Sequence, residues 1–159
     1  MDINKSLQGN GYINLFNAIF GKKRAKRTMG KLFTEQDAAN GLLKISKEVP
    51  KERAQLLERI LRLETAHFTS GQYKSTGSAG MEEGNWKNLP PHTTLPFKDN
   101  HDGHIGKFIV WNDVYDFLKY LNEYINRYNG NYARWNAIDS NKQREYTTKV
   151  NSIKNRTIT

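Results

Sequence analysis

A glutamate stands at the end of an apolar helical stripe in the first half of the chain. Leu57, Ile60 and Leu61 precede Glu64 by seven, four and three residues, which places all of them on one face of a helix. Burial disfavours the charged form of a carboxylate, and the negative end of a helix dipole adds to this effect. The pattern therefore predicts a raised pKa for Glu64, which suits a general acid. The alternative is a glutamate at a frayed helix end whose side chain bends into water.

Small residues and glycines follow this glutamate. Residues 75–81 read Ser-Thr-Gly-Ser-Ala-Gly-Met, and glycine permits tight backbone conformations that let another molecule approach the main chain. We expect the helix that carries Glu64 to end near Gly71, and the glycine-rich segment to form a tight loop. The candidate ligand-binding residues in this loop are Ser75, Gly77, Ser78 and Gly80.

The order of these residues resembles the lysozyme-like superfamily of peptidoglycan-cleaving enzymes. In its lytic transglycosylases a helix ends in Glu-Ser, an aromatic residue follows, and a Ser/Gly/Ala loop closes on Gly-Leu-Met. The matching positions here are Glu64-Thr65, Phe68 and 75–81. The Glu-Thr pair is also similar to the motif of flagellar and autolysin-type glucosaminidases. Later glucosaminidase motifs resemble residues 107–111, 114–118, 128, 136–139 and 146–150, in the same order.

The resemblance runs from about residue 54 to residue 153. It implies an α+β fold that is predominantly helical and lysozyme-like, with a small β-hairpin beside a substrate cleft. It also implies cleavage of peptidoglycan glycan strands, by glycoside hydrolysis or lytic transglycosylation, with Glu64 as general acid/base and no cofactor. The chain departs from the glucosaminidase pattern at Asn136, which replaces a tyrosine, and in a longer loop expected over 139–146.

Glycoside hydrolysis needs a second carboxylate or an electrostatic stabiliser besides the acid. Asp99 is the candidate that the resemblance favours, because glucosaminidases often place an acidic residue on the first hairpin strand. Asp102, Glu82 and Glu83 are the other carboxylates considered for this role. The candidates for stacking on sugar rings are Tyr73, Trp86, Trp111 and Tyr146, each with ordinary packing as the alternative.

The histidines do not complete a metal site. Glu64 and His67 share one helix face, but a di-iron carboxylate bundle needs two Glu-x-x-His helices and two further glutamates. The spacing of His101 and His104 fits no zinc pattern. We therefore expect no bound metal.

The 159 residues carry a formal net charge of +9 and include no cysteine. This length suits one domain, and we expect a lysozyme-like catalytic domain over 34–159, preceded by an amphipathic and basic segment at 1–33 that packs on the domain or extends from it. The charge favours polyanionic partners, namely anionic cell-wall polymers or a membrane surface, with nucleic acid a weaker prospect. No conventional signal peptide is visible, so the resemblance implies synthesis in the cytoplasm and action at the cell wall after release or delivery.

Local patterns indicate the order of the elements. Thr34 with Asp37 forms a helix N-cap pattern, and Pro50 separates that first helix from the one carrying Glu64. Strands are expected at 94–97 and 105–111 around a turn at 100–103, with a long helix over 114–125 and a last one over 143–153.

A second hypothesis assigns no catalytic activity to the same scaffold. Because a fold does not guarantee an activity, the chain is alternatively a non-catalytic module that binds polyanions or serves as a virion structural component. The two hypotheses differ in what the loss of the Glu64 carboxylate does to function.

Overall fold

The computed structural model describes residues 32–85, 89, 91–98 and 102–159. These form an α+β fold with about 53% helix and a small antiparallel sheet of two strands, which confirms the predicted fold class at this level. The segment predicted at 1–33 lies outside the described residues except for its last two. Along the chain the elements are α3 (Glu35–Ile45), α4 (Lys51–Glu64), α5 (Gly71–Thr76), η1 (Glu83–Asn85), β1 (Thr93–Lys98), β2 (Ile105–Val110), α6 (Val114–Arg127), η2 (Tyr132–Trp135) and α7 (Ser140–Ser152).

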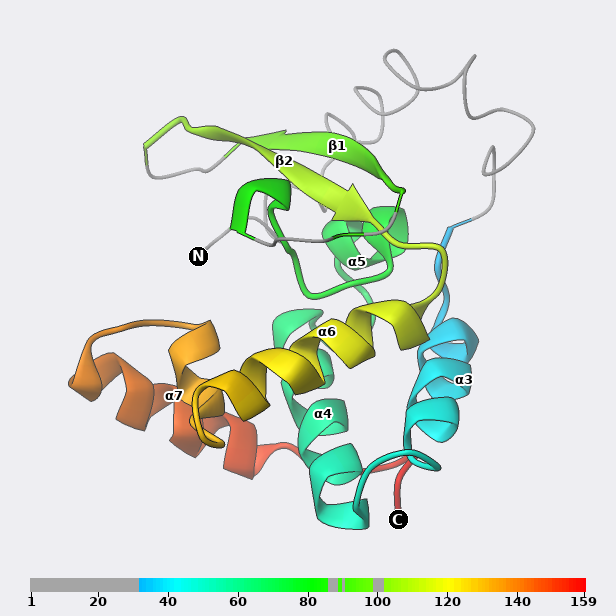
Figure 1. Ribbon diagram of the computed structural model, residues 1–159, viewed down its shortest axis with the longest axis vertical. Coiled ribbons are helices and arrows are strands. Elements are labelled where there is room, and N and C mark those ends of the chain that lie inside the picture. The colour runs from blue at the N-terminus through cyan, green and yellow to red at the C-terminus, as the bar shows by residue number, and fades with distance from the viewer. Residues whose placement is uncertain (1–31, 86–88, 90, 99–101) are drawn as a thin grey trace.

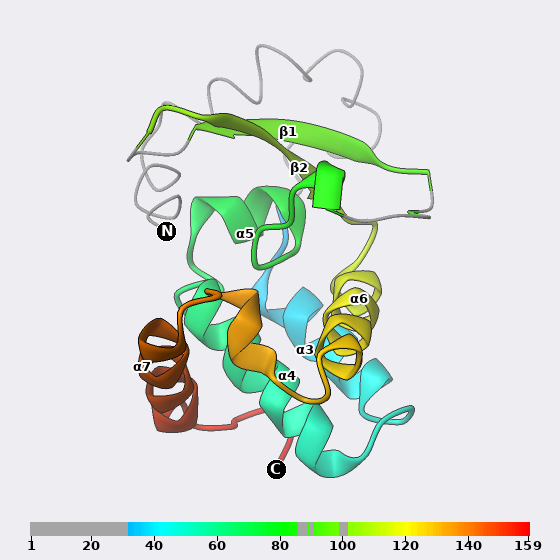
Figure 2. The same ribbon diagram turned by 60° about the vertical axis from the view of Figure 1, so that its left-hand side comes forward.

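The hairpin of β1 and β2 lies at one end of the molecule, and the longer helices form a body at the other end (Figure 1). In the turned view of Figure 2, α5 again lies directly beneath the hairpin, between it and this helical body. Within the body, α6 packs against α3, and α4 contacts α3, α6 and α7. One hydrophobic core joins the helices to α5 and β2. No helix in the described part of the chain is both long and apolar enough to cross a membrane.

Helix α3 begins with the predicted capping box. The Thr34 hydroxyl accepts the Asp37 amide at 3.2 Å, and the Asp37 carboxylate accepts the Thr34 amide at 2.7 Å, so two otherwise unpaired donors are satisfied. A Cβ atom at Gly41 would lie only 2.8 Å from the Tyr115 backbone nitrogen. The absence of a side chain at this position is therefore what lets α3 pack so closely on α6.

Helix α4 follows Pro50 and buries the apolar stripe predicted for it. Its helical conformation ends at Glu64, whereas an end near Gly71 was expected. The cause is a left-handed turn in which Ala66, His67 and Phe68 have φ angles of 50°, 54° and 69°. Such angles are costly for residues with a Cβ. Gly71 begins α5 instead.

The Thr65 hydroxyl holds this left-handed turn together. It donates to the Leu61 carbonyl at 2.6 Å and accepts the Phe68 amide at 2.9 Å. Thr65 is fully buried and Phe68 packs into the core, so the turn is fixed from both sides. The direction in which the chain leaves Glu64 is consequently set by buried contacts.

The predicted hairpin is confirmed. Antiparallel pairing runs from Thr93 opposite Val110 to Lys98 opposite Ile105. The loop before the hairpin is joined to β2, because Ile109 donates its amide to the Met81 carbonyl and Trp111 to that of Thr76, both at 2.9 Å. These bonds attach the glycine-rich loop to the hairpin.

The second helical half also follows the predicted order, with one correction. Helix α6 covers the apolar positions expected for it, and the Asp113 carboxylate caps it by accepting the Asp116 amide at 2.9 Å. The expectation of a long loop over 139–146 is wrong, because Asp139 caps α7, accepting the Lys142 amide at 3.0 Å. Helix α7 therefore starts at Ser140 and carries Tyr146 on its buried side.

A buried carboxylate fastens the C-terminal segment to α4. Glu58 is inaccessible to solvent and accepts five hydrogen bonds: from Arg62 Nε (2.7 Å), Asn155 Nδ2 (3.0 Å) and the amides of Arg156, Thr157 and Ile158 (2.9 Å each). Burial raises the pKa of this carboxyl, but the hydrogen bonds outweigh that effect and hold the pKa at about 2.

Candidate active site

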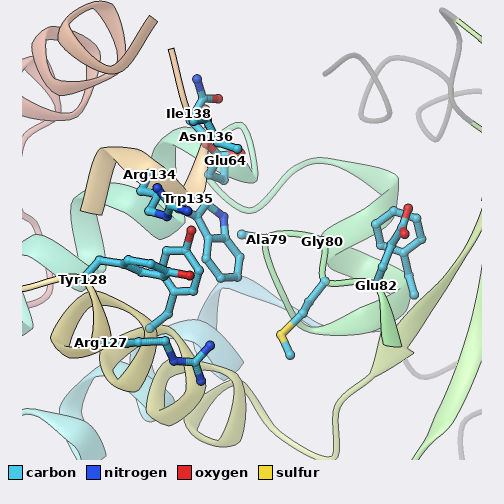
Figure 3. Close-up of a pocket in the computed structure, with 13 residues that line it drawn as sticks. Glu64, Ala79, Gly80, Glu82, Arg127, Tyr128, Arg134, Trp135, Asn136 and Ile138 are labelled. Atoms are coloured by element: carbon cyan, nitrogen blue, oxygen red, sulfur yellow. The ribbon is translucent and has the colours of Figure 1, made fainter. Parts of the chain in front are cut away.

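A pocket of about 630 Å³ lies where the helical body faces the hairpin. Its lining comes from the end of α4, the loop before η1, β2, the last turns of α6, and η2 with the residues after it. The lining residues are Glu64, Ala79, Gly80, Met81, Glu82, Phe108, Tyr124, Arg127, Tyr128, Arg134, Trp135, Asn136 and Ile138. Figure 3 shows Arg134, Tyr128 and Trp135 gathered on one side and Glu82 on the other.

Glu64 lies in the wall of this pocket as the last residue of α4. Its side chain keeps some contact with solvent, yet it is closely surrounded by protein atoms. Burial raises the pKa of the Glu64 carboxyl, while Tyr146 and Lys149 act in the opposite direction and do not cancel the effect. A raised pKa favours the protonated form of the carboxyl, and a protonated carboxyl beside an open pocket can donate its proton to a ligand.

Tyr146 lies beside Glu64. Its ring is buried, and its hydroxyl makes no fully aligned hydrogen bond among the described residues. Burial raises the pKa of Tyr146, and the neighbouring Glu64 carboxylate raises it further. Tyr146 is absent from the lining of this pocket but lines a smaller one of about 340 Å³ with Asn136 and Lys149. A stacking role for its ring stays a prediction.

Two glutamates on the same helix have pKa values shifted in opposite directions. Burial raises the pKa of both Glu58 and Glu64. Glu58 is surrounded by charged and backbone donors, whereas Glu64 has the Tyr146 hydroxyl as its main hydrogen-bonding influence. The donors, not the burial, therefore account for the opposite directions of the two pKa shifts.

Glu82 is the second carboxylate that the structure brings to the pocket. Its backbone pairs with Phe108 in an isolated bridge. Its side chain occupies the space over Gly106, where any Cβ would collide with the carboxylate oxygen. His104 Nε2 lies 3.6 Å from Glu82 Oε1. In Figure 3, Glu64 lies at the upper edge of the pocket beside Asn136, and Glu82 lies apart from it on the right.

The other carboxylates considered from the sequence do not line the pocket. Asp99 lies outside the described residues. Asp102 accepts the His104 amide at 2.8 Å and so stabilises the hairpin turn. Glu83 lies 2.8 Å from His92 Nε2. Among the described residues Glu82 is therefore the candidate partner of Glu64.

Most of the predicted loop residues shape the loop and do not reach the pocket. Gly77, with a φ of 74°, caps α5, and a Cβ there would meet the Phe33 ring. Ser78 is buried, and its hydroxyl accepts the Gly80 amide at 3.1 Å. Ser75 is also largely buried. Of the predicted ligand-binding residues in this loop, Gly80 alone lines the pocket.

Two predicted sugar-stacking residues belong to the core. Tyr73 is fully buried, and its hydroxyl donates to the Thr34 carbonyl at 2.6 Å. Trp111 is buried against Phe117 and Tyr120. Neither ring lines the pocket, so the stacking role is corrected for both. Trp86 lies outside the described residues.

Sequence reasoning missed the aromatic and cationic side of the pocket. Tyr124, Tyr128 and Trp135 line it together with Arg127 and Arg134. The available signal was the interleaving of aromatic and basic residues over 124–135. That signal is weak, because part of the stretch lies beyond the end of α6 and has no helical period to show which side chains share a face.

The described residues contain no group of three or more acidic or histidine side chains placed to hold a metal ion. His67 is exposed on the left-handed turn after Glu64, and His101 lies outside the described residues.

Comparisons of the chain with protein-family models, with curated proteins and with solved structures found no match.

Proposed function

We propose that this protein cleaves glycosidic bonds in the glycan strands of peptidoglycan on a lysozyme-like fold, with Glu64 as general acid/base. The observation that carries the proposal is the Glu64 carboxyl itself, whose pKa is raised by burial and which lines an open pocket of about 630 Å³. The position of the hairpin beside that pocket supports the lysozyme-like arrangement. Action at the cell wall after release or delivery belongs to the same proposal.

The reaction begins with proton transfer. Glu64 donates its proton to the glycosidic oxygen as the bond from that oxygen to the anomeric carbon breaks, and an oxocarbenium-like centre develops. In the hydrolytic route a water attacks this centre, and the Glu82 carboxylate is available to stabilise the positive charge or to accept a proton from the water. In the transglycosylase route a hydroxyl of the same sugar attacks, and the Glu64 carboxylate takes up the hydroxyl proton.

The remaining lining suits a saccharide. Trp135 and Tyr128 are half-buried aromatic residues in the pocket wall, and sugar rings have apolar faces that pack on such side chains. The net charge of +9 concentrates anionic wall polymers around the protein.

A non-catalytic polyanion-binding module is the second candidate function. Arg127 and Arg134 in the pocket favour it, because guanidinium groups bind anions without any need for an acid. Under this hypothesis the Glu64 carboxylate has no role in function.

Purified wild type and Glu64→Gln incubated with sacculi from several bacteria distinguish the two. Released muropeptides identified by mass spectrometry name the bond: reducing-end GlcNAc, reducing-end MurNAc or anhydro-MurNAc. We expect Glu64→Gln to lose about 100-fold or more of the activity, as for a general acid, and to unfold at the same or a higher temperature. The matched control is Glu123→Gln, which removes an exposed carboxylate of α6 outside the pocket lining. Release by Glu64→Gln at the wild-type rate, or wall binding without any release by the wild type, would refute catalysis.

A further inference from the structure

Two arginines line the same pocket as Glu64, although cleavage of a glycosidic bond between neutral sugars requires neither. Arg127 comes from the last turn of α6 and Arg134 from η2. The planar guanidinium group matches the geometry of a carboxylate and binds it through paired N–H donors. The lining therefore indicates a ligand that carries negative charge.

Arg134 is held in place by aromatic neighbours. Its guanidinium carbon lies 4.3 Å from the centroid of the Tyr128 ring, and Tyr124 is a hydrogen-bonding partner. The Tyr124 ring contacts Tyr128 at 4.9 Å between centroids and stands at 90° to Trp135 at 5.1 Å. A guanidinium has five N–H donors, so an orientation fixed in this way still leaves donors for a ligand.

The charges around Arg134 leave room for an anion. No acidic side chain of the described residues forms an ion pair with it, and it is half-buried, where screening by solvent is weaker than at the open surface. Burial favours the protonated, neutral form of Glu64. The Arg134 charge is therefore available to an anionic group of a ligand.

Given the proposed function, we propose that Arg134 binds a carboxylate carried by the saccharide, so that the pocket selects an acidic glycan strand over a neutral one. The carboxylate accepts hydrogen bonds from the free edge of the guanidinium, while a sugar ring packs against the neighbouring Trp135. Arg134 is thus a specificity-determining residue that takes no part in proton transfer.

Binding measured without turnover tests this inference separately from catalysis. Calorimetry on Glu64→Gln uses a tetrasaccharide of alternating GlcNAc and MurNAc with free lactyl carboxylates, and chitotetraose as a neutral ligand of equal length. We expect the acidic ligand to bind at least about 10-fold more tightly. Adding Arg134→Gln lowers its affinity about 10- to 100-fold, the range for a lost charged hydrogen bond, and leaves chitotetraose within about twofold.

Two further variants separate a local effect from a general one. Arg144→Gln lowers the net charge equally but alters an exposed residue of α7 outside the pocket lining, and we expect it to change neither affinity appreciably. Arg134→Lys keeps the charge but loses the planar fork, so it should restore part of the preference.

The outcomes separate this inference from the proposed function. Equal affinity for the two tetrasaccharides, or an equal loss for both in Arg134→Gln, overturns the inference alone. Preference for the acidic ligand by a protein that releases nothing from sacculi, or from glycan strands stripped of their stem peptides, supports the inference and refutes the proposed cleavage. Binding of neither ligand overturns the inference, and the sacculus assay then decides the proposed function by itself.

Discussion

Replacing Glu58 with glutamine tests whether one buried carboxylate holds the C-terminal segment on α4. Oε1 accepts from Asn155 and the Ile158 amide, and Oε2 accepts from Arg62 and the amides of Arg156 and Thr157. Glutamine has one acceptor oxygen and one NH₂ group. Whichever way it is oriented, at least two donors therefore face a donor, and the negative charge is lost.

The pKa shift of Glu58 and the hydrogen bonds that cause it give a similar cost. A pKa held at about 2, against an ordinary value of 4.5, corresponds to about 3 kcal/mol of stability at neutral pH. Loss of two charged hydrogen bonds, at about 1.5–3 kcal/mol each, gives about 3–6 kcal/mol. We therefore expect Glu58→Gln to lower the free energy of unfolding by about 3–4 kcal/mol, or the melting temperature by about 10 °C for a chain of this size.

The pH dependence has a definite sign. Because folding lowers the pKa of Glu58, its stabilising effect is fully present above the unfolded value of 4.5 and is lost as the pH falls toward about 2. Urea unfolding of wild type and Glu58→Gln at pH 7 and pH 3 should show a difference that shrinks to less than about half at the lower pH. Glu123→Gln, an exposed glutamate of α6, is the control and should change stability by less than about 0.5 kcal/mol. A Glu58→Gln cost below about 1 kcal/mol at pH 7, or one unchanged at pH 3, would refute the reasoning.

Two further predictions concern Glu64 and the turn after it. In Tyr146→Phe the carboxylate of Glu64 loses a stabilising hydroxyl, so its pKa rises. The limb of the pH–activity profile at which the acid loses its proton should then move to higher pH, and a limb that stays or moves down contradicts the assignment. Ala66→Gly relieves a φ of 50° and should stabilise the protein to urea by about 0.5–1 kcal/mol. The same change at Ala39 in α3 should destabilise it by about 1 kcal/mol, and equal signs would argue against strain at Ala66.

Local rules predicted much of the fold. The capping pair Thr34 and Asp37, Pro50 at the start of α4, and the turn residues between the strands each act within a few positions of the chain. They located α3, α4, the hairpin and α6 because such signals do not depend on what the rest of the chain does. The left-handed turn after Glu64 escaped prediction because tertiary contacts of Phe68 and the Thr65 hydroxyl, not a glycine, stabilise it.

The candidate site was predicted less completely. Glu64 could be identified from the sequence because its place on the apolar face of α4 depends only on the spacing of residues within that one helix. Trp135 and Arg134 could not, because they face Glu64 across about 70 residues of sequence, and only the packing of η2 beside α4 and α6 brings them there. The hydrogen bonds to Glu58 are hidden for the same reason, since four of its five donors lie nearly 100 residues away.

The contact between Glu82 and Gly106 makes one wall of the pocket assemble as a unit. The backbone of Glu82 is paired with Phe108, which also lines the pocket, while its side chain fills the space that Gly106 leaves on the same strand. If β2 detaches, the pocket loses the carboxylate and the apolar surface in the same event. This wall therefore has no half-formed state that retains the charge alone, and ligand binding across the pocket should slow hydrogen exchange along β2 as a whole.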